Sequence, residues 1–157
     1  MNGLLKKVLI VAVVMAAVAA AGWFGRKVYH KSEEHRFLAQ ARLAVEKKDW
    51  RNAGVCLQRV MQINPVNVPA SSMMADLLET AGSTNALTWR IRTAKLAAAN
   101  VTNRFAWAQT ALREKNLKSA AEAMGGVGEP SKSLPEYHKI AGALAWEQGR
   151  SAEAENQ

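Results

Sequence analysis

One stretch of the sequence has residues that could bind a phosphate group, the segment Gly126-Val-Gly-Glu-Pro-Ser131-Lys132-Ser133. A phosphate-binding loop places backbone N–H groups around the phosphates and lies between a strand and a helix. Here Ser131 stands where the second glycine is needed, Pro130 lies inside the loop, and the preceding residues have a helical pattern. The segment is therefore interpreted as a solvent-exposed connector.

The sequence contains no other set of residues at a spacing that suits catalysis or metal binding. His30, His35 and His138 are scattered, without cysteines or carboxylates at ligand spacing. Cys56 is the only cysteine, so it forms no intrachain disulfide, and within a predicted helix it suits the role of a small buried side chain. No nucleophile with a suitably spaced base is present. These observations predict a protein that is not an enzyme and uses no metal or cofactor.

The elements that carry these residues follow an internal repeat of small side chains. One series has steps of 33, 34 and 34 residues and the other has steps of 34, 33 and 34, as counted on the sequence. The two series are Ala53, Ala86, Ala120, Ala154 and Ala41, Ala75, Ala108, Gly142. Two small residues in each unit of about 34 residues are typical of stacked helix pairs, which press together where the side chains are small.

The first unit, residues 37–65, resembles a tetratricopeptide repeat (TPR). A polar turn with Asp49 as a helix cap joins two helical patterns, and Asn64-Pro65 ends the second. The residues that match the family in order and spacing are Ala41, Trp50, Ala53, Leu57 and Pro65. The unit differs from the family at Ala44, where tyrosine is usual, and at Gln40, where leucine is usual.

The later units match less completely, and the resemblance covers residues 34–157. The second unit has a turn at Gly82 and lacks the closing proline, and the third meets Gly125-Gly126 early, which predicts a short second helix. The fourth matches at Gly149, the position of the turn, and stops three residues after Ala154, so that its second helix is expected to be barely one turn. The positions that match in these units are Ala75, Leu78, Gly82 and Ala86, then Trp107, Ala108, Leu117 and Ala120, then Tyr137, Gly142, Gly149 and Ala154.

The resemblance implies an all-α fold in which residues 32–157 form an α-solenoid of about 3.5 TPR-like helix-turn-helix units. This solenoid would be incomplete at its C-terminal end and would leave four apolar side chains without full cover, which predicts either a longer natural chain or a frayed, self-associating end. The four are Tyr137, Ile140, Ala141 and Leu144.

The resemblance also implies a concave groove, lined by the first helix of each unit, that binds a protein or peptide. Its predicted lining consists of Arg42, Glu46, Asp76, Glu79, Phe105, Gln109, Arg113, Lys139 and Trp146. Mixed charges with two aromatic side chains suit a peptide segment. The alternative is that these residues form only the solvated face of each helix.

The N-terminal segment, residues 1–31, is predicted to be a membrane anchor with basic flanks. The 17 residues Val8–Phe24 carry no charge and would span about 25 Å as a helix, and Leu4 and Leu5 extend the apolar run. A cleaved signal peptide is the competing interpretation, with a small-residue site at residues 19–21. We expect a single span through residues 4–24 in a bacterial inner membrane, with the repeat domain on the exported side.

Charge and anchor together define the functional expectation. Five of the 21 Lys and Arg residues and none of the 13 acidic residues lie in residues 1–31, so the net charge of +8 is concentrated at the membrane flank. This distribution argues against a nucleic-acid partner. The sequence predicts a membrane-tethered, non-enzymatic scaffold. The alternatives are the anchoring or regulatory part of a larger envelope enzyme or assembly machine, and a secreted soluble repeat protein.

Overall fold

The computed structural model describes residues 12, 15 and 29–155, with side chains described as far as Arg150. This part of the chain is all-α and contains no strand, as the sequence predicts. Within it, no helix has both the length and the apolar character needed to cross a membrane. The predicted anchor, residues 4–24, and the alternative signal-peptide site lie outside the described residues apart from positions 12 and 15.

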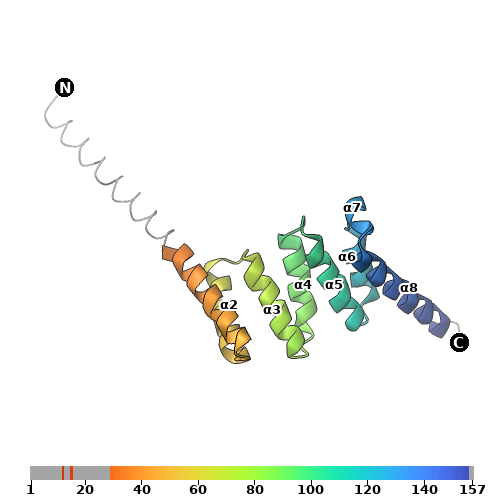
Figure 1. Cartoon of the computed structure of the whole chain (residues 1–157), viewed down its shortest axis with the longest axis horizontal. Helices are drawn as coiled ribbons and strands as arrows, with labels where there is room; N and C mark the ends of the chain where they lie inside the picture. Colours follow the sequence, from red (N-terminus) through yellow and green to blue (C-terminus); the bar gives the residue numbers. More distant parts are fainter. Residues whose placement is uncertain (1–11, 13–14, 16–28, 156–157) are drawn as a thin grey trace, which may run out of the picture.

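Most of the helices form consecutive pairs joined by short turns. The first described helix covers residues 29–46. The helices that follow it are α2 (Trp50–Ile63), α3 (Val68–Thr80), α4 (Asn85–Leu96), α5 (Val101–Arg113), α6 (Leu117–Gly125), the short α7 (Glu129–Lys132) and α8 (Pro135–Glu155). Figure 1 shows them side by side in a row, in which α3 packs against α2 and α4, and α5 packs against α4, α6 and α8.

The small residues of the repeat lie where the helices meet. Six of the eight are buried with at most 2% of their surface exposed, namely Ala41, Ala53, Ala75, Ala86, Ala108 and Ala120. This confirms that Ala53 and Ala120 are buried at helix contacts. The seventh, Gly142, is exposed on α8, and the side chain of Ala154 lies outside the description.

The turns between paired helices repeat one backbone geometry. Lys48, Gly82 and Lys115 adopt φ angles of 58°, 65° and 54° in the left-handed region, at steps of 34 and 33 residues. The residue after the first of them, Asp49, accepts a hydrogen bond from the Asn52 N–H at 3.1 Å and so caps α2, as predicted. Helix α2 ends at Ile63, directly before Asn64-Pro65, and α6 is short and ends at Gly125, also as predicted.

Asparagine caps of three helices were not identified from the sequence. The side chains of Asn67, Asn100 and Asn116 accept hydrogen bonds from backbone N–H groups in the first turns of α3, α5 and α6 at 2.7, 3.0 and 3.0 Å. Each satisfies an N–H group that lacks a partner within its helix.

The fourth unit differs from the prediction. Helix α8 continues through Gly149 to Glu155, so there is no turn and no second helix within the fourth unit. The prediction that its apolar face lacks cover is wrong for Ile140 and Leu144, which are 2% and 9% exposed and belong to the core cluster formed with α5 and α6. Tyr137 and Ala141 pack against the same cluster and are partly buried.

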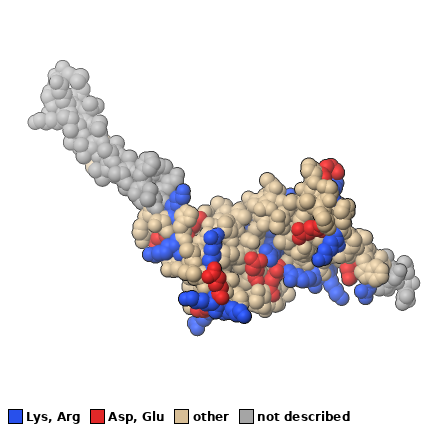
Figure 2. Space-filling model, in the orientation of Figure 1, with Lys and Arg blue, Asp and Glu red and all other residues tan. Residues whose placement is uncertain are grey.

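The core consists of two clusters along the row. The N-terminal cluster has five buried residues, Ala41, Leu57, Val60, Ala70 and Met74, from residues 29–46, α2 and α3. The C-terminal cluster has twelve, among them Phe105, Trp107 and Met124, and extends from α4 to α8. Figure 2 shows acidic and basic side chains interspersed over the face that covers these clusters.

Candidate binding surface on α3 and α5

The predicted groove residues fall on the first helix of each of the three pairs and on the unpaired helix α8. Arg42 and Glu46 lie in the helix of residues 29–46, Asp76 and Glu79 in α3, Phe105, Gln109 and Arg113 in α5, and Lys139 and Trp146 in α8. All are exposed except two. Glu79 is partly buried, and Phe105 is 1% exposed.

Phe105 is therefore a correction to the predicted groove. Its ring belongs to the C-terminal core cluster, together with Trp107 of the same helix and Leu87 of α4. A side chain enclosed by its own protein is not available to a partner, and its burial stabilises the contact between helices instead. The aromatic anchor that the sequence places at this position does not exist on the surface.

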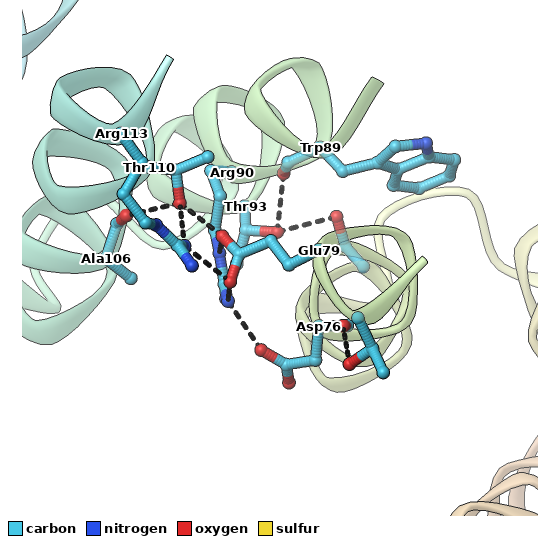
Figure 3. Close-up of polar contacts among 10 residues, drawn as sticks. Asp76, Glu79, Trp89, Arg90, Thr93, Ala106, Thr110 and Arg113 are labelled. Atoms are coloured by element: carbon cyan, nitrogen blue, oxygen red, sulfur yellow. Dashed lines mark hydrogen bonds and ion pairs between the residues drawn. The ribbon is translucent and has the colours of Figure 1, made fainter. Parts of the chain in front are cut away.

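Three of the predicted residues are brought together in one charged network (Figure 3). At its centre Arg90, from α4, donates two hydrogen bonds to the Glu79 carboxylate, from Nε to Oε1 at 2.9 Å and from Nη2 to Oε2 at 3.0 Å. The same Nη2 atom lies 2.5 Å from Oδ1 of Asp76. The planar guanidinium suits this two-pronged contact, which holds α3 and α4 at one spacing.

The network continues to α5 on its other side. Nη2 of Arg113 lies 2.7 Å from Oε2 of Glu79, and the Thr110 hydroxyl donates a hydrogen bond to Oε1 of the same carboxylate. One carboxylate therefore receives donors from α4 and from α5. Arg90 and Glu79 are 11% and 16% exposed, whereas Arg113 and Asp76 are 61% and 60% exposed. The inner pair orders the helices, and the outer pair remains accessible to solvent.

The network sets the charge state of Glu79. Partial burial alone would raise the pKa of Glu79, but hydrogen bonds from Arg90, Thr110 and Arg113 and the positive charge of Arg90 outweigh it. The pKa of Glu79 falls from 4.5 to about 2. Burial opposes the charge of Arg90 as well, but its contacts with Glu79 and Asp76 raise its pKa. Both groups are charged at neutral pH.

A recess lies beside the network at the C-terminal end of α5. It has a volume of about 180 Å³ and is lined by Glu79, Gly82, Ser83, Thr84, Ala86, Thr110, Arg113 and Glu114. We call it the arginine recess. Its walls are the α3–α4 turn on one side and the last turn of α5 on the other. Hydroxyl groups and the exposed Arg113 make it a polar site of modest size.

A second recess is bordered by Asp76, the exposed acidic residue of the network. It has a volume of about 150 Å³ and is lined by Val45, Trp50, Met73, Asp76, Leu77 and Thr80, most of which are apolar. We call it the tryptophan recess. Trp50 is 42% exposed, so part of its ring is available on the surface. The buried side chains of α2 are Ala53, Leu57 and Val60, and Trp50 is not among them.

The remaining predicted groove residues do not join this network. Arg42 borders a separate hollow formed with Glu34, His35, Leu38, Ala39, Asn67 and Pro69. Nearby, Glu34 accepts hydrogen bonds from Asn64 and Asn67 at 2.9 and 2.5 Å, which ties the first described helix to the α2–α3 turn. Gln109 donates a hydrogen bond to Glu136 of α8 at 3.1 Å. Glu46, Lys139 and Trp146 lie on the surface away from Arg90.

This surface includes Arg90, Thr110 and Trp50, which sequence reasoning did not place in the groove. Arg90 lies on the second helix of its pair, which the repeat assigns to the opposite side. Arg90 follows Asp76 and Glu79 by 14 and 11 positions, but the turn between α3 and α4 interrupts the helix, so no helical period relates these residues. Only the packing of α3 against α4 brings these side chains into contact.

The segment that resembles a phosphate-binding loop is a connector that contains the short helix α7. The guanidinium of Arg104 lies close over Gly126, where an added Cβ would come within 1.9 Å of Nη1. Glycine at position 126 therefore permits this approach. Among residues 12, 15 and 29–155, no three His, Cys, Asp or Glu side chains are grouped so that they could bind a metal ion.

The chain matches no protein-family model. Comparison with curated proteins likewise finds no match.

Proposed function

We propose that this protein is a TPR-like α-solenoid that binds a segment of a partner protein across α3 and α5 and is tethered to a membrane through residues 4–24. The observation that carries the proposal is the pair of recesses on either side of the charged network. Both are bordered by α3, and each presents a different chemistry. Such an arrangement suits recognition of an extended segment and requires no catalytic group.

The chemistry of the two recesses indicates what the segment should contain. The tryptophan recess has apolar walls, so it suits an apolar side chain of the partner. The arginine recess is lined by Arg113, which is paired with Glu79 through Nη2 but is 61% exposed, so its other N–H groups can pair with a carboxylate of the partner. Asp76 borders the tryptophan recess and disfavours an acidic group of the partner there. A segment with an apolar residue and an acidic residue in sequence fits this surface.

The resemblance to TPR units supports this proposal through the small residues and the turns. The buried alanines recur at the period of the repeat, and the left-handed turn residues recur at the same period. A row of helix pairs built in this way presents its first helices on a common surface, as in other α-solenoids. The unbranched row in Figure 1 agrees with that architecture.

The binding surface is tested with a display library of random peptides selected on the full chain in detergent. We expect enriched peptides to pair an apolar residue with an acidic one. Trp50→Ala and Arg113→Ala should each weaken their binding by roughly tenfold or more, because aromatic and arginine side chains dominate interface energies. Val55→Ala on α2 and Lys118→Ala on α6 are matched controls, since both residues are exposed and line neither recess.

Two outcomes would contradict the binding proposal. One is a set of selected peptides that binds Trp50→Ala and Arg113→Ala as tightly as it binds the unaltered chain. The other is a loss of binding in the control variants alone. Thermal melts of Trp50→Ala and Arg113→Ala separate loss of binding from loss of folding.

The tether is tested separately by membrane fractionation. We expect the protein to remain in the membrane pellet after carbonate extraction, because residues 4–24 form an uncharged run with basic flanks. Recovery of a soluble form that begins near Gly22 would instead indicate signal-peptide cleavage.

A further inference from the structure

Helix α8 covers the end of the row with one face and leaves its other faces uncovered. Tyr137, Ile140 and Leu144 face the C-terminal core cluster. On the uncovered side, Trp146 is 68% exposed, which is more than any other large hydrophobic side chain in the described part of the chain. Figure 1 shows that the C-terminal part of α8 projects beyond the other helices. An exposed tryptophan on a projecting helix indicates an interaction surface.

The backbone of α8 is open to close approach near this tryptophan. A Cβ added at Gly142 or Gly149 would meet no atom within 4 Å. The residues that precede Gly142 in the repeat, Ala75 and Ala108, are fully buried against neighbouring helices. Gly142 and Gly149 lie about 40° and 60° from Trp146 around the helix axis, so the helix surface beside this tryptophan carries no bulky side chain at these two positions.

The charges on α8 indicate which helix this is. At about 100° per residue, four charged residues and one tryptophan lie within about 60° of Ala143 around the helix axis, on a face that is bordered by the buried Ile140. They are Glu136, Lys139, Trp146, Glu147 and Arg150. Their charges are arranged with opposite signs around Ala143. Glu136 and Arg150 lie seven positions on either side of it, and Lys139 and Glu147 lie four positions on either side.

We propose that α8 packs antiparallel against α8 of a second copy of this chain, with the two helices crossing at Ala143. Two-fold symmetry then pairs Lys139 of each copy with Glu147 of the other, and Glu136 with Arg150. A parallel arrangement would place each charge opposite its own kind. The charge pattern of α8 is complementary to the same pattern in an antiparallel helix. A second copy of this chain is therefore the partner that the pattern favours.

The same arrangement uses the small and the aromatic residues. The small side chain of Ala143 at the crossing lets the two backbones approach closely, and Trp146 lies at the edge of the contact. Oε1 of Glu136 accepts a hydrogen bond from Gln109 of its own chain. The other carboxylate oxygen of Glu136 is the one that pairs with Arg150 of the second copy. The dimer is independent of peptide binding, because neither recess includes a residue of α8.

Cysteine cross-linking tests the crossing point directly in the full chain. Cys56 is the only cysteine, so Cys56→Ala provides a cysteine-free background. Ala143→Cys in this background should form a covalent dimer under mild oxidation. Ala145→Cys is the matched control, since Ala145 is also exposed on α8 but lies about 160° away from Ala143 around the axis. Cross-linking at position 145 and not at 143 would overturn the proposal.

A charge exchange tests the pairing by sedimentation in detergent. Lys139→Glu should raise the dimer dissociation constant about tenfold or more, because it creates two like-charge contacts across the symmetry axis. The double variant Lys139→Glu with Glu147→Lys should restore the dimer. A monomeric unaltered chain overturns the proposal, and so does a dimer unaffected by Lys139→Glu. Failure of the double variant to recover would show that a different surface is used. Each of these three overturning outcomes would leave the proposal of peptide binding standing, because neither recess includes a residue of α8.

Discussion

The two core clusters differ in size, and the difference indicates how the molecule divides its stability. The N-terminal cluster has five buried residues and no buried aromatic ring, whereas the C-terminal cluster has twelve and includes Phe105 and Trp107. Buried apolar area is the main stabilising term, so the C-terminal half should open last. The charged network lies between the clusters and joins α3 to α4 and α5.

The largest expected effect comes from emptying the larger cluster. Phe105→Ala should lower the free energy of unfolding by about 3–5 kcal/mol, because it removes a fully enclosed ring. Leu57→Ala in the smaller cluster should cost about 2–4 kcal/mol and should mainly deprotect residues 29–46 and α2. Hydrogen exchange followed by mass spectrometry measures both. Equal loss of protection in every helix for both variants would show that the clusters unfold as one unit.

A second comparison places extra volume at equivalent positions of the repeat in the two halves of the chain. Ala53→Leu and Ala120→Leu each overpack a contact between helices where the alanine is 0% exposed. The expected loss is about 1–3 kcal/mol for each. Ala120→Leu should lower the main melting transition more, since α6 belongs to the more stable half. An unchanged melting curve for Ala120→Leu would contradict the position of the repeat.

The network between the clusters predicts a dependence on acid. The pKa of Glu79 is about 2 in the folded chain and 4.5 as its ordinary value, so its stabilising effect is complete above pH 4.5. That effect is lost as pH falls from 4.5 toward 2. The loss is on the order of 1–2 kcal/mol, because solvent on the open side of the network weakens it.

Urea unfolding at several pH values measures this loss. Glu79→Gln is the matched variant and should be less stable at neutral pH but less sensitive to acid. A Glu79→Gln chain that retains the full acid dependence would place the titrating group elsewhere.

The sequence is informative where a position serves the helix contact itself, as with the small residues and the first turn. Ala41, Ala53 and Ala120 are required by close packing whatever the protein binds. The charged network cannot be predicted from the sequence in this way, because Arg90 contacts Glu79 only where α4 packs against α3. The repeat position of Phe105 predicts a surface location, whereas its large apolar ring is buried in the C-terminal core cluster. At Gly149 the glycine alone does not stop a helix that lacks a following proline.

The smallest expected effects compare the equivalent turns of the three pairs. Lys48, in the N-terminal half, and Lys115, in the C-terminal half, have left-handed φ angles, whereas the second turn has glycine at Gly82. A side chain in this conformation costs about 1–2 kcal/mol, and glycine relieves it but adds freedom to the unfolded chain. Lys48→Gly and Lys115→Gly should therefore each raise stability by only about 0.5 kcal/mol. Gly82→Ala should lower the stability by about 1 kcal/mol.

Hydrogen exchange and thermal melts measure these changes. If the two halves open independently, Lys48→Gly will protect only residues 29–46 and α2 in hydrogen exchange, whereas Lys115→Gly will raise the main melting transition. A gain from Gly82→Ala would show that the repeated turn geometry is not a source of strain.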